Sequence, residues 1–239
     1  MQLADTRITI GAVNYCSTDW AKLLVESVCK HSSEPHEIIL VDNSPAGPME
    51  LPEMEGVKII RPGDNVGHGT GLDMAIAAAN GKFFLALDID AHLLGPGWED
   101  ACRAKLDAET KILGARGGDL KPYRPCVSFF EKEYFVRGGH SFENMPVSTK
   151  GGFMTIDVGV FFALRTLHDG FKIAPLEVGE SFYKDVWGDT YVLDGKSFFY
   201  HNWYGTRFMN GDAVIDGRTK EDMLAAKKNL FDQIYGTHE

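Results

Sequence analysis

The decapeptide GKFFLALDID, residues 81–90, decides the fold class and indicates the chemistry. Its first part, Gly81–Leu87, is almost wholly apolar, which is typical of a strand buried on both faces of a sheet. Asp88 and Asp90 follow, and residues two apart in an extended chain point to the same side. Their carboxylates repel each other, and a hard cation such as Mg²⁺ or Mn²⁺ relieves that repulsion while its remaining positions take substrate phosphates. The segment predicts a metal–diphosphate site at a strand end; the alternative is a solvated loop that holds two aspartates.

Composition narrows the classes of partner. The chain has 239 residues, 44% of them hydrophobic, and a formal net charge of −10 with no basic block. Nucleic acid and anionic membrane surfaces are therefore excluded as general partners. The start lacks a signal-peptide pattern, and no run approaches the roughly 20 apolar residues of a membrane span. The four cysteines form no Cys-x-x-Cys pair, so we expect reduced thiols and a cytoplasmic protein.

The first half of the chain alternates strand and helix patterns. Strands are predicted at Arg7–Val13, Glu37–Val41, Val57–Ile60 and Phe83–Leu87, and helices after Asp19, over Thr70–Ala79 and from Pro96 towards Leu106. This order predicts an α/β fold with a mostly parallel central sheet and helices on both faces. Ligands of such sheets bind beyond the carboxyl ends of the strands, where Asp42 and Asp88 fall.

The second half is less regular. Arg116–Gly118 and Arg137–His140 have loop composition, whereas Met154–Phe162 and Ser197–Tyr200 have strand composition. A closing helix is predicted from about Thr219 to Tyr235. No linker or internal repeat is visible, so we expect one domain over residues 1–239.

The glycine-rich run Asn65–Gly71 precedes a predicted helix. It is neither a Walker loop nor a Rossmann fingerprint, because no Gly-Lys-Ser/Thr follows and its glycines are two apart throughout. Its glycines allow the backbone to approach a ligand closely at a helix N-terminus. The alternative is a tight strand-to-helix turn.

Three motifs in a fixed order resemble a known family. They are Asp42-Asn43-Ser44 after a buried strand, Asn65-Val66-Gly67 before a helix, and Asp88-Ile89-Asp90 after the next strand. In this order they resemble the family-2-like glycosyltransferases, which have a GT-A (Rossmann-like) fold and use a nucleotide-diphospho-sugar donor. The resemblance covers about residues 7–107 well. It implies a donor half at about 1–107 and an acceptor half, with the C-terminal helix, at about 108–239.

The resemblance implies roles in the donor half. The implied nucleotide-binding residues are Val13, Asn14, Tyr15, Asp42, Asn65, Gly67 and Asp88. Asp42 would meet the base, Asp88 would face the ribose or the metal, and Asp90 would bind the metal on the diphosphate. The chain departs from the family at Cys16, where asparagine is frequent, and Tyr15 can equally be a core aromatic residue.

In the acceptor half the family often has a Glu-Asp pair that supplies the general base. The nearest match is Trp187-Gly188-Asp189, so Gly188 departs from the pattern and Asp189 is the predicted catalytic base. The carboxylates that compete for this role are Asp157, Glu177, Glu180, Asp185 and Asp194. His201 is the predicted third metal ligand, with a hydrogen-bonded structural ring as the alternative. Trp203 and Tyr204 are predicted to stack on an acceptor sugar, although packing explains them as well.

Together these features predict a metal-dependent glycosyltransferase of the hexosyltransferase type. We expect Mn²⁺ or Mg²⁺ as cofactor, a UDP-sugar donor first and dTDP- or GDP-sugars next, and a carbohydrate or glycolipid-type acceptor. Inversion at the transferred carbon is implied by the resemblance. The alternatives are a sugar-phosphate nucleotidyltransferase, whose Gly-x-Gly-Thr-Arg loop is absent from the first predicted strand, and a non-catalytic carbohydrate-binding domain.

Overall fold

The computed structural model describes residues 7–45, 55–115, 123–149, 152–203, 214–215 and 217–236. The strands are β1 (Ile8–Asn14), β2 (His36–Asp42), β3 (Val57–Ile60), β4 (Phe83–Leu87), β5 (Ala91–Leu93), β6 (Thr110–Ala115), β7 (Arg124–Glu131), β8 (Met145–Thr149), β9 (Gly152–Ile156), β10 (Lys172–Val178), β11 (Gly188–Leu193), β12 (Lys196–Asn202), β13 (Val214–Ile215) and β14 (Arg218–Thr219). The helices are α1 (Thr18–His31), α2 (His68–Ala78), α3 (Trp98–Arg103), α4 (Lys132–Arg137), α5 (Val160–His168) and α6 (Lys220–Tyr235). Among these residues no helix combines the length and apolar character that a membrane crossing requires.

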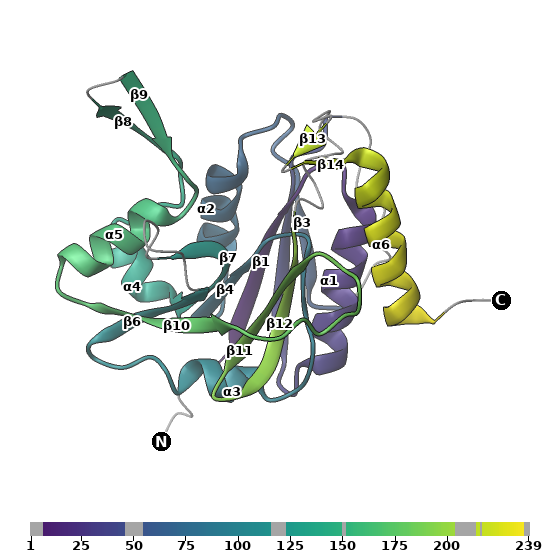
Figure 1. Cartoon of the computed structure of the whole chain (residues 1–239). Coiled ribbons are helices and arrows are strands. Elements are labelled where there is room, and N and C mark those ends of the chain that lie inside the picture. Colours follow the sequence, from purple (N-terminus) through teal and green to yellow (C-terminus); the bar gives the residue numbers. More distant parts are fainter. Residues whose placement is uncertain are drawn as a thin grey trace.

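Ten strands form one mixed sheet in the order β3-β2-β1-β4-β7-β6-β10-β11-β12-β5 (Figure 1). The α/β class is as predicted. The expected parallel pairing holds for β3-β2-β1-β4. Beyond β4 the strands pair antiparallel, with one exception: β6 and β10 are parallel.

Helices cover both faces of the sheet (Figure 1). Successive residues of a strand point to opposite faces, so β4 directs Leu85 into the core under α1, α3 and α6, and Phe84 into the core under α2, α4 and α5. Both side chains are fully buried. This double burial explains why the segment before Asp88 is a continuous apolar run rather than an alternating one.

The predicted strand Met154–Phe162 was wrong in its second part. The strand β9 ends at Ile156, and α5 begins at Val160. The Asp157 carboxylate accepts a hydrogen bond from the Val158 N–H at 2.9 Å, and Gly159 adopts φ 70° at the helix start. A short apolar run does not distinguish a buried strand from a buried helix, so the local pattern was ambiguous here.

The C-terminal helix lies where the sequence predicts it. A capping box starts α6: the Thr219 hydroxyl accepts from the Asp222 N–H, and the Asp222 carboxylate accepts from the Thr219 N–H. Phe231 of α6 packs edge-on against Trp20 of α1 with ring centroids 5.4 Å apart. The helix therefore extends the cover that α1 gives to this face of the sheet. Of the two loops predicted in the second half, Arg116–Gly118 lies outside the described residues. The other, Arg137–His140, begins one residue later than predicted, because Arg137 is the last residue of α4.

A buried histidine makes the fold sensitive to acid. Burial lowers the pKa of His92 to about 3, and the Tyr183 hydroxyl lies 2.8 Å from its Nε2. His92 takes up a proton near pH 6.5 in the unfolded chain but only near pH 3 in the folded one. The contribution of neutral His92 to the unfolding free energy is therefore complete above about pH 6.5 and is lost as the pH falls towards the folded pKa. We expect the unfolding free energy to fall by up to about 1.4 kcal/mol per pH unit from this group alone.

Urea denaturation at pH 7 and pH 5 measures this effect. The His92→Leu variant should lose less stability than the wild type between the two pH values. The control is His168→Leu, because the His168 side chain is 88% exposed and its removal should leave the difference unchanged. Equal pH dependence in the wild type and His92→Leu would show that His92 does not set it.

Candidate metal and ligand site

The two aspartates of residues 88–90 lie in the turn between β4 and β5. The Ala91 N–H donates to the Asp88 carbonyl at 2.9 Å, which closes the turn, and β5 then pairs with β12. In that pairing His201 lies opposite Ala91, and the Asn202 N–H donates to the Asp90 carbonyl. Sheet register thus brings His201 to residues more than a hundred positions earlier in the chain.

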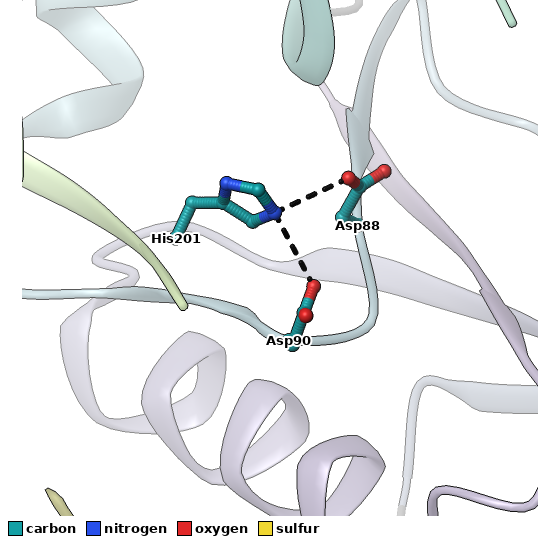
Figure 2. A group of neighbouring side chains, drawn as sticks. All are labelled: Asp88, Asp90 and His201. Carbon is teal, nitrogen blue, oxygen red and sulfur yellow. Dashed lines mark ion pairs between the residues drawn. The ribbon is translucent and has the colours of Figure 1, made fainter. Parts of the chain in front are cut away.

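Figure 2 shows the His201 ring directed at both carboxylates. Its Nε2 lies 3.3 Å from Asp88 Oδ2 and 3.4 Å from Asp90 Oδ1, and the three possible ligand atoms all lie within 4.8 Å of one another. Neighbouring ligands of an octahedral ion with bonds of about 2.1 Å are roughly 3 Å apart, so these donors fit a divalent cation. All three predicted metal ligands are therefore brought together.

Opposite charges govern the electrostatics of Asp88, Asp90 and His201. Burial acts to lower the pKa of His201, but the Cys126 and Asp90 side chains and the hydrogen bonds to Asp88 and Asp90 outweigh it and hold the pKa well above its ordinary value. Burial likewise acts to raise the pKa of Asp88, and the two histidines His201 and His68 lower it overall. Without a metal, a protonated His201 compensates the carboxylates. A divalent cation at this position would compete with that proton for Nε2.

A fourth group, His68, was not among the predicted site residues. It is the first residue of α2, and its Nε2 lies 3.6 Å from the second oxygen of Asp88. This nitrogen is buried and has no hydrogen-bond partner among the described residues. A histidine inside the glycine-rich run Asn65–Gly71 is the sequence signal that indicates a site residue at this position.

The predicted base, Asp189, lies beside the metal group. It is directly opposite His201 in the β11–β12 pair, and opposite residues of antiparallel strands share a face. Its Oδ2 accepts from Arg124 Nη1 at 2.7 Å and from the Tyr191 hydroxyl at 3.3 Å, which fixes the orientation of the carboxylate. The residue is 7% exposed, whereas the Arg124 side chain is 45% exposed.

Gly188 stands where the resembling family often has a glutamate, and the structure gives a steric reason for the glycine. A Cβ at this position would lie 2.5 Å from the Tyr200 hydroxyl and 2.5 Å from the His201 carbonyl. The ring of Tyr200 occupies the space that a glutamate side chain needs. The competing carboxylates differ in position: Asp194 pairs with Lys105 at the far end of the β11–β12 hairpin, and Glu180 directly follows Gly179, whose N–H donates to the Thr190 carbonyl. Glu180 is thus closer along the sheet to Asp189 than Asp194 is.

The predicted nucleotide residues Asn14 and Asp42 meet at the ends of β1 and β2. Asp42 Oδ1 accepts from Asn14 Nδ2 at 2.9 Å and from the Ser44 hydroxyl at 2.7 Å, and Arg61 Nε lies 3.9 Å from Oδ2. The Ser44 hydroxyl in turn accepts from the Cys16 N–H. The strand ends therefore hold a connected polar network, in which the nucleotide-binding roles of Asn14 and Asp42 stay predictions.

Two of the three glycines in this run pack closely against other segments, and the predicted nucleotide-binding roles of Asn65 and Gly67 stay predictions. A Cβ at Gly69 would lie 2.4 Å from the Phe142 carbonyl, and one at Gly71 would lie 2.8 Å from Val13. Only Gly67 faces open space, with φ 88° as the residue before α2. Its N–H donates to the Asn65 side chain at 2.9 Å, so both predicted residues of this motif shape the loop. Val13 is itself buried and packs under α2.

The aromatic residues of the acceptor half surround an arginine. The Arg218 guanidinium lies 4.0 Å from the ring centre of Trp187 and 5.6 Å from that of Trp203. Tyr15 is half-buried after β1, and Tyr204 lies outside the described residues. Trp203 is a predicted acceptor-binding residue, whereas no role is predicted for Trp187, Arg124 or Arg218. Arg124 and Arg218 had no local signal, because their partners come from other strands.

Comparison with known proteins adds a family and a fold. Residues 10–115 match the family model described as Glycosyl transferase family 2. No curated protein matches the chain. Among solved structures, S. aureus TarS 1-349 in complex with UDP-GlcNAc superposes with a TM-score of 0.55 at 14% identity, covering 95% of this chain and 67% of that one.

The mannosyltransferase PcManGT from Pyrobaculum calidifontis, in complex with GDP-Man and Mn²⁺, superposes with a TM-score of 0.50 at 14% identity. The match covers 70% of this chain, which spans 54% of that enzyme. At these identities the superpositions show a shared fold, and the family match supplies the sequence relation. Residues 10–115 are thus similar in sequence to the family-2 glycosyltransferases, and the chain shares the GT-A fold of the superposed enzymes.

Proposed function

We propose that the protein transfers a hexosyl group from a nucleotide-diphospho-sugar to a hydroxyl of a carbohydrate or glycolipid-type acceptor, with inversion. The observation that carries this proposal is the convergence of Asp88, Asp90 and His201 at the carboxyl end of β4, with Asp189 opposite His201. A site of this kind can hold a diphosphate through a metal on one side and remove a proton from an acceptor on the other.

The proposed roles differ between the metal ligands and the general base. Asp88, Asp90 and His201 would hold Mn²⁺ or Mg²⁺, which when bound neutralises charge on the leaving diphosphate. Asp189 accepts the proton of the acceptor hydroxyl while the oxygen of that hydroxyl bonds to the anomeric carbon of the sugar. The bond from that carbon to the diphosphate breaks, and its electron pair leaves with the nucleoside diphosphate. Arg124 and Tyr191 keep the Asp189 carboxylate oriented through this step.

For the donor we propose a uridine nucleotide first, and dTDP or GDP next. A carboxylate at Asp42 can accept the imide N–H of uracil, and Asp42 ends β2 beside Asn14. The two superposed structures bind UDP-GlcNAc and GDP-Man respectively, so both nucleotide classes occur on this fold.

Replacing Asp42 by alanine should weaken UDP binding by roughly 1–3 kcal/mol, the cost of losing a charged, buried hydrogen bond. Calorimetry with UDP and Mn²⁺ measures this change. Ser44→Ala removes a hydroxyl that bonds to the same oxygen and serves as the control for disturbance of the network. If Asp42→Ala binds every nucleotide as the wild type does, the carboxylate is structural.

A thermal-shift screen tests the donor class. Nucleoside diphosphates and their sugars, each with Mn²⁺, should raise the melting temperature, because a ligand that binds the native state stabilises it. The uridine compounds should give the largest rise. No rise with any nucleotide in the presence of Mn²⁺ would contradict the proposed function.

A further inference from the structure

We propose that Trp187, Arg218 and Trp203 form an anion-binding acceptor subsite, so that the acceptor is a saccharide or polyol carrying a phosphate, sulfate or carboxylate group. The inference rests on the proposed function, because it takes Asp189 as the base that receives the acceptor proton. It goes further in stating the chemical class of the acceptor.

The register of the β11–β12 hairpin places this group beside the base. Asp189 lies opposite His201, and the Trp203 N–H donates to the Trp187 carbonyl, which continues the same ladder by two residues. Trp187 and Trp203 lie one residue beyond the ends of β11 and β12, and this hydrogen bond extends the pairing to them. Side chains two apart in an extended chain share a face, so we place the Trp187–Trp203 pair on the face of the Asp189–His201 pair, roughly 7 Å along it. Arg218 of β14 stacks on this aromatic pair.

The mode of stacking suits a further ligand. A guanidinium that covers an aromatic ring uses its flat face, and its N–H donors point outward in its own plane, where they can grip an anion in a bidentate manner. Among the described residues, no carboxylate forms an ion pair with Arg218 within 4.0 Å. The other arginine near the base, Arg124, is paired with Asp189. Arg218 interacts electrostatically with Asp222, but no ion pair within 4.0 Å joins the two, so the guanidinium keeps N–H donors for a ligand.

The acceptor is the better source of that anion than the donor. In the proposed function the diphosphate of the donor binds at Asp88 and Asp90. His201 contacts Asp90 where β12 pairs with β5. An acceptor that reaches Asp189 must come from the part of the face that the donor leaves open, and the next pair along it is Trp187–Trp203. Aromatic rings suit the C–H-rich face of a sugar, and the arginine suits an anionic substituent on it.

Tryptophan fluorescence can test the subsite directly. The protein is first saturated with UDP and Mn²⁺, which fills the donor position, and is then titrated with glycerol 3-phosphate and, separately, with glycerol. The other two tryptophans, Trp20 and Trp98, are buried in the core, so a signal from a surface ligand should come from Trp187 and Trp203. We expect a saturable change with the phosphate ester, at least tenfold weaker binding of glycerol, and at least tenfold weaker phosphate-ester binding by Arg218→Gln.

Two further variants separate a binding role from a structural one. Arg218→Lys keeps the charge and should recover part of the binding, whereas Arg137→Gln, on the exposed side of α4, should behave as the wild type. Calorimetry with UDP and Mn²⁺ accompanies each titration. UDP affinity should be the same in the wild type and Arg218→Gln.

The outcomes distinguish the possible errors. If UDP binds and the phosphate ester gives no saturable signal, the subsite is refuted while the proposed function stands. If Arg218→Gln weakens UDP binding itself tenfold or more, the arginine holds the diphosphate of the donor and the acceptor assignment is wrong. If the wild type binds none of UDP, dTDP and GDP with Mn²⁺, the proposed function fails and this inference fails with it.

Discussion

The Asp189→Asn variant should turn over a nucleotide-sugar about 10²–10⁴-fold more slowly than the wild type, with little change in donor affinity. Asparagine keeps the shape of the side chain and removes the proton acceptor. The carboxylate is oriented by Arg124 and Tyr191 and lies opposite His201, so its loss affects the chemical step more than binding. Steady-state kinetics give kcat, and calorimetry gives the donor affinity.

A panel of carboxamide variants makes this prediction specific. Asp194→Asn is the matched control, because Asp194 lies at the far end of the same hairpin and pairs with Lys105. Glu180→Gln probes a rival that follows a residue paired beside Asp189 in the sheet. Near-normal turnover in Asp189→Asn together with a collapse in Glu180→Gln would transfer the role of base to Glu180 and leave the metal group untouched. Melting temperatures show whether the loss of the Arg124 ion pair has disturbed the fold.

Replacing Asp90 should abolish the metal-dependent part of nucleotide binding. The Asp90 side chain is only 7% exposed and lies 3.4 Å from His201, so few other groups can take its place as a ligand. We expect Asp90→Asn with Mn²⁺ to bind UDP no better than the wild type does in EDTA, because the metal is what links a carboxylate-lined site to an anionic ligand. Asp90→Ala should give the same result.

The control for this variant comes from the same acidic surface. Asp100→Asn changes an exposed carboxylate in α3 that pairs with Arg103, and it should bind UDP and Mn²⁺ as the wild type does. Asp90→Asn affinity that still rises on addition of Mn²⁺ by as much as in the wild type would show that the ion is held elsewhere. Identical affinities in EDTA for all three proteins are required for either conclusion.

Local patterns predicted the parts of the site that lie within one strand and its turn. The apolar run before Asp88 marks β4, and the spacing of Asp88 and Asp90 marks paired carboxylates, because both features follow from strand periodicity. The meeting of His201 with these residues depends on the β5–β12 pairing, which no local pattern encodes. The family resemblance suggests His201 as a metal ligand, and the β5–β12 register explains why it lies beside Asp88 and Asp90.

The features that the sequence did not reveal are those made by distant segments. The ion pair of Arg124 with Asp189 joins β7 to β11, and the stack of Arg218 on Trp187 joins β14 to the start of β11. The start of α5 was misread for a different reason, since its apolar residues satisfy both a strand and a buried helix. Within residues 67–71, Gly69 and Gly71 make room for the Phe142 backbone and the Val13 side chain, which are distant partners that no local pattern encodes.

The central claim is that this chain cleaves a nucleotide-sugar at a metal site built from Asp88, Asp90 and His201. The most direct measurement is release of UDP from a panel of UDP-sugars with Mn²⁺ and again with EDTA, in the wild type and in Asp90→Asn. The account predicts UDP release by the wild type with Mn²⁺, and release near background in EDTA and in the variant. Equal release in all three conditions, or none by the wild type from any uridine, thymidine or guanosine diphospho-sugar, would contradict it.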